Sequence, residues 1–460
     1  MNSSFQLSRL PRTLLLVLLF LSLSSCAPAS PATPSEAPSQ TPPTQAAPSR
    51  PPAKPPVSGV IQSKQVRQAN PEAPLADLAE LADDNTAFAL DFYQQVRSQP
   101  GNLFYSPYSL SLALAMTYAG AAGQTQAQMA KTLRFSLPAE RLHPAFNQLD
   151  LLLASRGAQP SGGQPDQGFK LHIANSLWGQ TGYTFLPAFL DTLAQNYGAG
   201  LHLADFVKAP EPSRLAINDW VSQQTADKIK DLIPQGAIDP LTRLVLANAI
   251  YFKASWETQF EPKLTQNASF HALDGGQPSV QMMSYSMAES LAYASGDGYQ
   301  AVELPYLGGD VGMDVLVPDE GQFAGFEASL DIGRLSAILS GLKPQQVDLK
   351  LPKFTIESSF SLPQTLAQMG MVDAFKPEVA DFSGMDGTHF LYISDVVHKA
   401  VVAVDENGTE AAAATAVIAS LASAPAGEIV QLTVDRPFIF VIRDLPTNSI
   451  LFVGRVVNPA

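Results

Sequence analysis

Cysteine is nearly absent from this 460-residue chain, whose only example is Cys26. A single cysteine excludes a disulfide within the chain and a multi-cysteine zinc site. Basic residues are also scarce, because 28 lysines and arginines stand against 42 aspartates and glutamates, for a formal net charge of −14. This balance argues against nucleic acid as a partner and against charge-driven binding to an anionic membrane surface.

The common sequence motifs of enzymes are also missing: there is no G-x-S-x-G, no H-E-x-x-H, no phosphate-binding glycine loop and no G-x-G-x-x-G after a strand. His398 could be a general base for a distant serine, but a lone histidine in an apolar strand more often makes structural hydrogen bonds. Asp381, Asp386 and His389 match no closed coordination pattern, which favours a polar turn over a metal site. We therefore expect no catalytic residue, no metal and no cofactor.

The N-terminus has the layout of an export signal. Arg9 and Arg12 precede an apolar run over residues 14–23, which is too short to span a membrane. The sequence LSSC resembles the bacterial lipoprotein box, so we predict a signal peptide at 1–25 and lipid attachment at Cys26. The protein would then be exported and anchored to the cell envelope or outer surface. The alternative is ordinary cleavage after Ala27 and a secreted, soluble protein.

A proline-rich segment follows. Residues 27–56 are almost entirely Pro, Ala, Ser, Thr and Gln, a composition that buries too little apolar surface to fold. In the extended form typical of proline-rich chains, at about 3.1 Å per residue, it would span up to roughly 90 Å. We assign 26–74 to a disordered tether and 75–460 to a folded domain.

The spacing of apolar residues in the domain changes from a helical pattern early in the chain to short β-rich segments later. Apolar residues at three- and four-residue spacing over 75–99 predict an amphipathic helix with an interruption near Asp83. Ser106 before Pro107 is a helix-start signal, and the apolar run after it predicts a buried helix. Later segments such as MDVLVP, RPFIFVIRD and SILFVGRVV are short and β-rich. Helices early and strands late favour an α+β domain with mainly antiparallel sheets.

Eight segments of the domain match one family in the expected order. They are NLFYSPYSLSLALAMTYAGAAGQT (102–125), INDWVSQQTADKIKDLIPQGAIDPLTRLVLANAIYFKASWETQF (217–260), ELPY (303–306), LPKF (351–354), MGMVDAF (369–375), ADFSGM (380–385), ISDVVHKAVVAVDENGTEAAAATAV (393–417) and DRPFIFVIRD with SILFVGRVVNP (435–459). Together they resemble the serpins, a family of serine-protease inhibitors. The resemblance covers essentially residues 75–460.

The resemblance implies a fold of three β-sheets and eight or nine helices, with an exposed reactive-centre loop that begins at Gly408. In serpins the target protease cleaves this loop and forms an acyl-enzyme. The loop then inserts as a new strand in the main sheet and carries the protease with it, which distorts the catalytic site. The uncleaved state is therefore metastable.

The hinge of this loop has the composition that insertion requires. Alternate residues Thr409, Ala411 and Ala413 would face one side of the sheet, and none is charged. No proline interrupts the run, and the one charge, Glu410, falls on the other face. The hinge residues are Glu406, Gly408, Thr409, Glu410, Ala411, Ala412, Ala413 and Ala414. A surface helix is the alternative, because alanine is the best helix former, but interspersed threonine, valine and isoleucine disfavour it.

Family spacing from Glu406 places the reactive bond at Ala422–Ser423. Alanine suits the small specificity pocket of an elastase-like protease, whereas a shift by one residue to Leu421 would suit a chymotrypsin-like pocket. The absence of lysine and arginine nearby argues against trypsin-like targets. The resemblance thus implies a monomeric suicide-substrate inhibitor that forms a covalent complex with its protease. A non-inhibitory binding or carrier protein and an inhibitor of cysteine proteases are the alternatives.

The resemblance also implies roles for other residues. Ser106, Ser109, Asn248 and His398 match the polar cluster beneath the opening strands of the main sheet. Trp256, Lys353 and Glu406 match the site where the loop enters, with an expected Lys353–Glu406 ion pair. Ala254 stands where the family more often has glycine, a difference that we expect to be harmless. Basic residues are not clustered, so no heparin-type cofactor site is expected.

Overall fold

The structure is a computed structural model, and it describes residues 59–156, 169–409 and 428–460. Contacts divide the chain into Met1–Ala53 and Lys54–Ala460, and every described residue belongs to the second unit. None of the helices within these ranges is both long and apolar enough to cross a bilayer.

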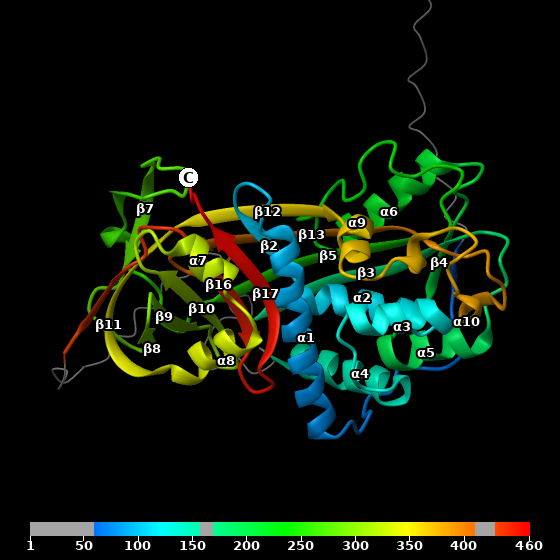
Figure 1. Cartoon of the computed structure of the whole chain (residues 1–460), viewed down its shortest axis with the longest axis horizontal. Coiled ribbons are helices and arrows are strands. Elements are labelled where there is room, and N and C mark those ends of the chain that lie inside the picture. Colours follow the sequence, from blue (N-terminus) through cyan, green and yellow to red (C-terminus); the bar gives the residue numbers. More distant parts are fainter. Residues whose placement is uncertain (1–58, 157–168, 410–427) are drawn as a thin grey trace, which may run out of the picture. The chain divides into compact units, whose positions relative to one another are not determined.

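The described residues form ten α-helices (Figure 1). They are α1 (Leu75–Val96), α2 (Pro107–Tyr118), α3 (Gly123–Thr132), α4 (Ala139–Ser155), α5 (Pro187–Tyr197), α6 (Pro210–Gln224), α7 (Phe323–Ala328), α8 (Ile332–Gly341), α9 (Pro363–Gln368) and α10 (Ser383–Asp386). The predicted buried helix is α2, in which all residues are buried and whose N-cap Ser106 accepts a hydrogen bond from Ser109 N. Helix α1 continues through Asp83 without interruption, because that carboxylate lies on the exposed face.

The described strands form two sheets. They are β1 (Val60–Ile61), β2 (Leu103–Tyr105), β3 (Lys170–Gln180), β4 (Leu201–Ala204), β5 (Leu244–Ser255), β6 (Gln266–Ser269), β7 (Ser279–Ser284), β8 (Glu289–Gly296), β9 (Tyr299–Pro305), β10 (Val311–Pro318), β11 (Lys343–Pro352), β12 (Phe354–Ser361), β13 (Ile393–Asp405), β14 (Gly408–Thr409), β15 (Val430–Thr433), β16 (Phe438–Asp444) and β17 (Ser449–Val456). The seven-stranded sheet has the order β1-β4-β3-β5-β14-β13-β12, and we call it the main sheet.

The second sheet has ten strands, in the order β2-β17-β16-β10-β9-β8-β11-β7-β6, with β15 paired to β11. Strand β11 pairs with β8 through its first half and with β7 near its end, so two of the three expected sheets are joined into one hydrogen-bonded network. The described helices number ten rather than eight or nine, and three of them, α7, α9 and α10, have six residues or fewer. The α+β fold class is confirmed.

The two faces of the main sheet belong to different hydrophobic clusters. Val245, Ala247 and Ala249 of β5 pack with residues of α6, whereas the alternating Leu246 and Ile250 belong to the larger core that contains α2. Figure 1 shows α2 and α6 on opposite sides of the long strands. Because successive side chains of a strand point to opposite faces, this two-residue period explains why β5 is buried along nearly its whole length.

A segment before α1 also contacts the domain, and we call residues 59–68 the N-terminal strap. Its strand β1 pairs antiparallel with β4 at the edge of the main sheet. Gln68 N donates to the Gln195 carbonyl at 2.9 Å, and Arg67 forms an ion pair of 2.6 Å with Asp150. A Cβ on Gly200 would lie 2.8 Å from the Ile61 carbonyl oxygen, so the strap packs closely on this glycine. The strap therefore belongs with the folded domain and not with the tether to which we assigned it.

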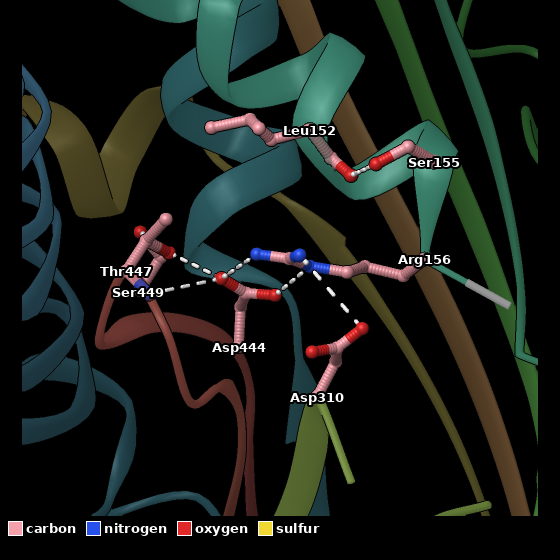
Figure 2. Close-up of polar contacts among 7 residues, drawn as sticks. All are labelled: Leu152, Ser155, Arg156, Asp310, Asp444, Thr447 and Ser449. Carbon is pink, nitrogen blue, oxygen red and sulfur yellow. Dashed lines mark hydrogen bonds and ion pairs between the residues drawn. The ribbon is translucent and has the colours of Figure 1, made fainter. Parts of the chain in front are cut away.

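The end of α4 is attached to the second sheet by a buried ion pair. Figure 2 shows Arg156, which follows α4, directed at Asp444 at the end of β16. Arg156 Nε lies 2.7 Å from Asp444 Oδ1, and Thr447 donates to Asp444 Oδ2 through its backbone N and its hydroxyl. Asp310 lies farther from the guanidinium, at 3.8 Å. Asp444 is fully buried, and the bidentate guanidinium satisfies it.

Candidate loop-insertion site

The main sheet contains two parallel strands that separate at one end. Strand β13 pairs with β5 from Ile393–Leu244 to Val401–Tyr251. Beyond that point β14 lies between them: Gly408 and Thr409 pair with Ser255 and Ala254 of β5 and with Asp405 and Val404 of β13. Gly408 and Thr409, the second and third residues of the predicted hinge, therefore already occupy the end of the gap between β5 and β13. A strand that continued from β14 would have to break the β5–β13 pairing.

Thr409 is held inside this gap. It is 0% exposed, and its hydroxyl lies 2.7 Å from the Tyr306 hydroxyl. The Tyr306 ring stacks on Trp256 with a centroid distance of 4.5 Å. Burial raises the pKa of Tyr306 well above its usual range, although the bond to Thr409 opposes this, so the phenol stays protonated.

Glu406 fixes the turn that leads from β13 into β14. Lys353 Nζ lies 2.9 Å from Glu406 Oε2, and the Thr265 hydroxyl donates to Glu406 Oε1 at 2.7 Å. Burial of Glu406 tends to raise its pKa, but the hydrogen bonds from Lys353 and Thr265 outweigh burial, and the net shift is downward. Trp256 contributes through Nε1, which donates to the Asp405 carbonyl at 3.0 Å. The structure thus brings Trp256, Lys353 and Glu406 together; their role in loop insertion stays a prediction.

Gly408 can be replaced only with strain. Its φ is +151°, and a Cβ built on it would lie 2.1 Å from the backbone oxygen of Ala254. A side chain here must push β14 away from β5.

We expect Gly408→Ala to destabilise the protein by about 1–3 kcal/mol, because the methyl group cannot fit against β5 without backbone movement. Urea unfolding would measure this. Gly325→Ala in α7 is the matched control, since a Cβ there meets nothing within 4 Å. Equal midpoints for Gly408→Ala and wild type would contradict the expected clash.

A second set of polar side chains lies beneath β5 and β13, in the region where these two strands are paired. His398 on β13 is opposite Asn248 on β5, which is opposite Asn175 on β3. Asn248 Oδ1 is hydrogen-bonded to His398 Nδ1, and Asn248 Nδ2 donates to the Ser109 carbonyl and hydroxyl at 2.7 and 2.9 Å. We call Ser106, Ser109, Asn248 and His398, with Asn175, the gap cluster. Its His398–Asn248 bond crosses the two strands that must separate.

The geometry of His398 disfavours the general-base interpretation. Its Nε2 accepts the backbone N–H of Ser106 at 3.1 Å, which leaves Nδ1 as the donor to Asn248. Both ring nitrogens are therefore used within the buried cluster. Burial lowers the pKa of His398 to about 3, even though the bond to Asn248 acts in the opposite direction.

This depressed pKa predicts that the native state loses stability in mild acid. The unfolded histidine, with a pKa near 6.5, takes up a proton before the folded one does, so stability is full above about pH 6.5 and falls towards pH 3. At pH 5 the loss from His398 is about 2 kcal/mol relative to pH 7. His143 and His202, whose pKa values burial lowers to about 4, act in the same direction.

Urea unfolding at pH 7 and pH 5 would measure this loss. In His398→Gln, which keeps hydrogen-bonding capacity but does not titrate, we expect the loss to be smaller by about 2 kcal/mol. An equal loss in wild type and variant would show that His398 does not contribute.

Three contributors to the site were missed in the sequence analysis. Asn175 has no motif of its own, and only its register opposite Asn248 reveals it. Tyr306 ends the ELPY segment, which the sequence analysis matched to the family, but nothing in the sequence indicated its hydrogen bond with Thr409. No feature of the sequence pointed to Thr265.

Ala254, the position where the family more often has glycine, is buried beside Thr409.

The weak metal-site alternative finds no support within the described ranges. His389 Nδ1 lies 3.3 Å from Asp381 Oδ1, whereas Asp386 accepts hydrogen bonds from Thr388. No group of three metal-ligating side chains was found in the part of the chain that the structure describes. The polar-turn interpretation agrees with these contacts.

Several predicted residues lie outside the described residues. They are the signal peptide 1–25, Cys26, the hinge residues Glu410, Ala411, Ala412, Ala413 and Ala414, and the reactive-bond residues Leu421, Ala422 and Ser423. Of the hinge, the structure describes Glu406, Gly408 and Thr409.

Known proteins are similar to this chain in sequence and in fold. The family model of the serpins, described as serine protease inhibitors, matches residues 83–459. The chain belongs to the serpin family. Serpins are protease inhibitors and not catalytic enzymes, which confirms that the chain is not an enzyme.

Individual relatives match over most of their length. Leukocyte elastase inhibitor A of Mus musculus is 40% identical over 384 residues, which cover 82% of this chain and 98% of that protein. Leukocyte elastase inhibitor of Homo sapiens is 38% identical with the same coverage. Among solved structures, the thermophilic serpin tengpin in its native state has a TM-score of 0.73 and 29% identity, covering 86% of this chain and 96% of that chain. Uncleaved ovalbumin has a TM-score of 0.71 and 27% identity, covering 82% and 100%.

Proposed function

We propose that the protein is a monomeric suicide-substrate inhibitor of elastase-like or chymotrypsin-like serine proteases, with its reactive bond at Ala422–Ser423. The observation that carries this proposal is the position of β14, whose two residues stand between β5 and β13 where those strands part. A cleaved loop would continue from Thr409 along this gap as a new central strand. The relatives named leukocyte elastase inhibitors support an elastase-like target.

Such a switch requires that the sheet stays closed before cleavage and that the loop enters it in one register. The gap cluster provides the first property, and Glu406 provides the second. The cluster adds one buried side-chain hydrogen bond, between His398 and Asn248, to the backbone pairing of β5 with β13, so the strands stay closed before cleavage, and both the pairing and this bond must break for insertion. The Lys353–Glu406 contact anchors the start of the loop, so the new strand enters in one register.

Incubation with pancreatic elastase and with chymotrypsin, followed by denaturing electrophoresis, tests the inhibitory function. We expect a covalent complex with at least one of them and none with the same protease after its active-site serine is blocked. Sequencing of the released C-terminal fragment should begin at Ser423, or at Ala422 if Leu421 occupies the specificity pocket. Cleavage without a complex, with continuing protease turnover, would contradict inhibition and favour a non-inhibitory binding role.

We also propose that the protein is exported and anchored by lipid at Cys26. The sole cysteine directly follows the sequence LSS after an apolar run, and a proline-rich segment follows it, which supports a lipidated residue with a spacer. Expression in a bacterium with a labelled fatty acid would test this. We expect label and membrane association in the wild type and neither in Cys26→Ala; label-free wild type in the soluble fraction would contradict the proposal.

A further inference from the structure

Asparagine is followed by glycine at one place in the chain, Asn407–Gly408, in the turn between β13 and β14. In such a pair the backbone nitrogen of the glycine can attack the side-chain amide carbon of the asparagine and close a small cyclic imide, because the two groups are held close together. Glycine favours this attack, since it has no Cβ to obstruct the approach and its backbone is the least restricted. The turn therefore joins the two groups that spontaneous deamidation requires.

The side-chain amide of Asn407 is also unbound, unlike most asparagine amides of the protein. Within residues 59–156, 169–409 and 428–460, three asparagines have no side-chain hydrogen bond: Asn70, Asn267 and Asn407. Asn70 precedes a proline, which has no backbone N–H, and Asn267 precedes alanine, whose Cβ hinders the attack. The side chains that are hydrogen-bonded are those of Asn85, Asn102, Asn147, Asn175, Asn196, Asn218, Asn248, Asn448 and Asn458.

The contacts that hold Asn407 in place come from its backbone. Its carbonyl oxygen accepts a hydrogen bond from Trp256 N at 2.9 Å, and its N–H donates to Asp405 Oδ1 at 2.8 Å. The residue is partly exposed, so water has access to it. A change at the Asn407 side chain therefore breaks no existing contact until the backbone itself is altered.

We propose that Asn407 is a site of spontaneous deamidation, and that the isoaspartate formed there releases β14 from the gap. Gly408 N bonds to Asn407 Cγ, and the side-chain nitrogen leaves as ammonia with the proton that Gly408 N gives up. Water then adds to one of the two imide carbonyl carbons. Breaking the Cγ–N bond gives aspartate, whereas breaking the bond from the main-chain carbonyl carbon to Gly408 N gives isoaspartate. No oxidant or reductant takes part.

Isoaspartate changes the path of the backbone, which then runs through Cβ and Cγ of residue 407. This adds one carbon–carbon bond of about 1.5 Å before Gly408. The carbonyl that accepted the Trp256 N–H becomes a free carboxylate beside the chain. Gly408 has no room for the added length, since a Cβ there would already lie 2.1 Å from the Ala254 oxygen. The pairing of Gly408 and Thr409 with β5 must shift as a result.

The consequence for inhibition rests on the inhibitory function proposed above. A cleaved loop would begin its insertion from Gly408 and Thr409, which are already paired in the gap. A molecule in which these two residues are displaced starts insertion late, so hydrolysis of the acyl-enzyme releases the protease. Deamidation of Asn407 thus limits the working life of the inhibitor.

Storage of the purified full-length protein in warm, mildly alkaline buffer, with peptide mapping and enzymatic methylation of isoaspartate over time, tests the modification. We expect isoaspartate to form at least about tenfold faster at Asn407 than at Asn267, the internal control whose amide is also unbound but whose successor has a Cβ. Hydrogen exchange at the Trp256 amide should quicken in the converted molecules, because its acceptor is lost. Conversion no faster than at Asn267, or unchanged exchange at Trp256, would overturn the proposal.

Titration with whichever of pancreatic elastase and chymotrypsin forms the covalent complex tests the effect on inhibition. When half of the molecules carry isoaspartate, the number of inhibitor molecules consumed per protease should double. Asn407→Gln is the matched variant, because it keeps an amide on a longer side chain that closes the imide less readily; it should keep its stoichiometry during storage. An equal loss in stored Asn407→Gln would overturn the role of Asn407 in that loss.

Failure of the proposed function gives a different pattern of results. If fresh wild type forms no covalent complex, the inhibitory function falls, and the limit on working life falls with it. Peptide mapping and the exchange of the Trp256 amide still decide whether isoaspartate at Asn407 forms and releases β14, because neither measurement involves a protease target.

Discussion

Replacing Thr409 with arginine is expected to convert the protein from an inhibitor into a substrate. Thr409 is buried between β5 and β13, where its hydroxyl meets Tyr306 and its neighbours are Ala254 and Val404. A guanidinium at this position has no carboxylate partner among these neighbours, and burying it costs several kcal/mol. Insertion would then be slower than hydrolysis of the acyl-enzyme, and the protease would escape.

Titration of active protease against the protein would measure this effect as the number of inhibitor molecules consumed per protease inhibited. We expect that number to rise at least tenfold in Thr409→Arg, with the rate of loop cleavage nearly unchanged. Thr409→Val is the matched control, because it loses the bond to Tyr306 but remains apolar and β-branched. A stoichiometry in Thr409→Arg equal to that of wild type would show that this position is not buried during inhibition.

The second large effect is expected from Asn248→Ala in the gap cluster. Asn248 accepts from His398 and donates to the Ser109 carbonyl and hydroxyl, and all three residues are fully buried. The substitution leaves these partners unsatisfied, which should lower the free energy of unfolding of the uncleaved protein by about 3 kcal/mol. In the cleaved protein an inserted strand would separate β5 from β13, so the same substitution should cost much less there.

Urea unfolding of uncleaved and cleaved protein would compare the two states. A double-mutant cycle with His398→Phe isolates the pair across the gap, and we expect a coupling energy of about 1–3 kcal/mol in the uncleaved protein and near zero after cleavage. His398→Phe retains an aromatic ring beside Phe360, on which His398 now stacks. Equal coupling before and after cleavage would mean that the two strands do not separate.

Features set by local chemistry were predictable from the sequence. Ser106 and Pro107 predicted the start of α2, and the apolar composition after them predicted that the helix is buried. Both features depend on residues that are close together in the sequence. The α+β class followed from the order of helical and strand-like segments. The interruption near Asp83 was wrong, because exposed acidic residues on the solvent face do not break a helix.

Features that depend on distant partners were not predictable in this way. Asn175 joins the gap cluster only because β3 and β5 pair in one register, a fact that no local pattern contains. The sequence placed Arg67 in the tether, whereas the structure shows it bound to Asn147 and Asp150 on α4. The merging of two expected sheets depends on β11 pairing with β8 and then with β7, which composition cannot specify.

The N-terminal strap has a practical consequence for preparing the domain. A fragment cut at Leu75 would lack β1, and the backbone of β4 at the edge of the main sheet would lose the pairing partners Val60 and Ile61. Unpaired sheet edges recruit strands from other molecules and so promote aggregation. A soluble fragment should therefore begin before residue 59, even though the helical core starts sixteen residues later.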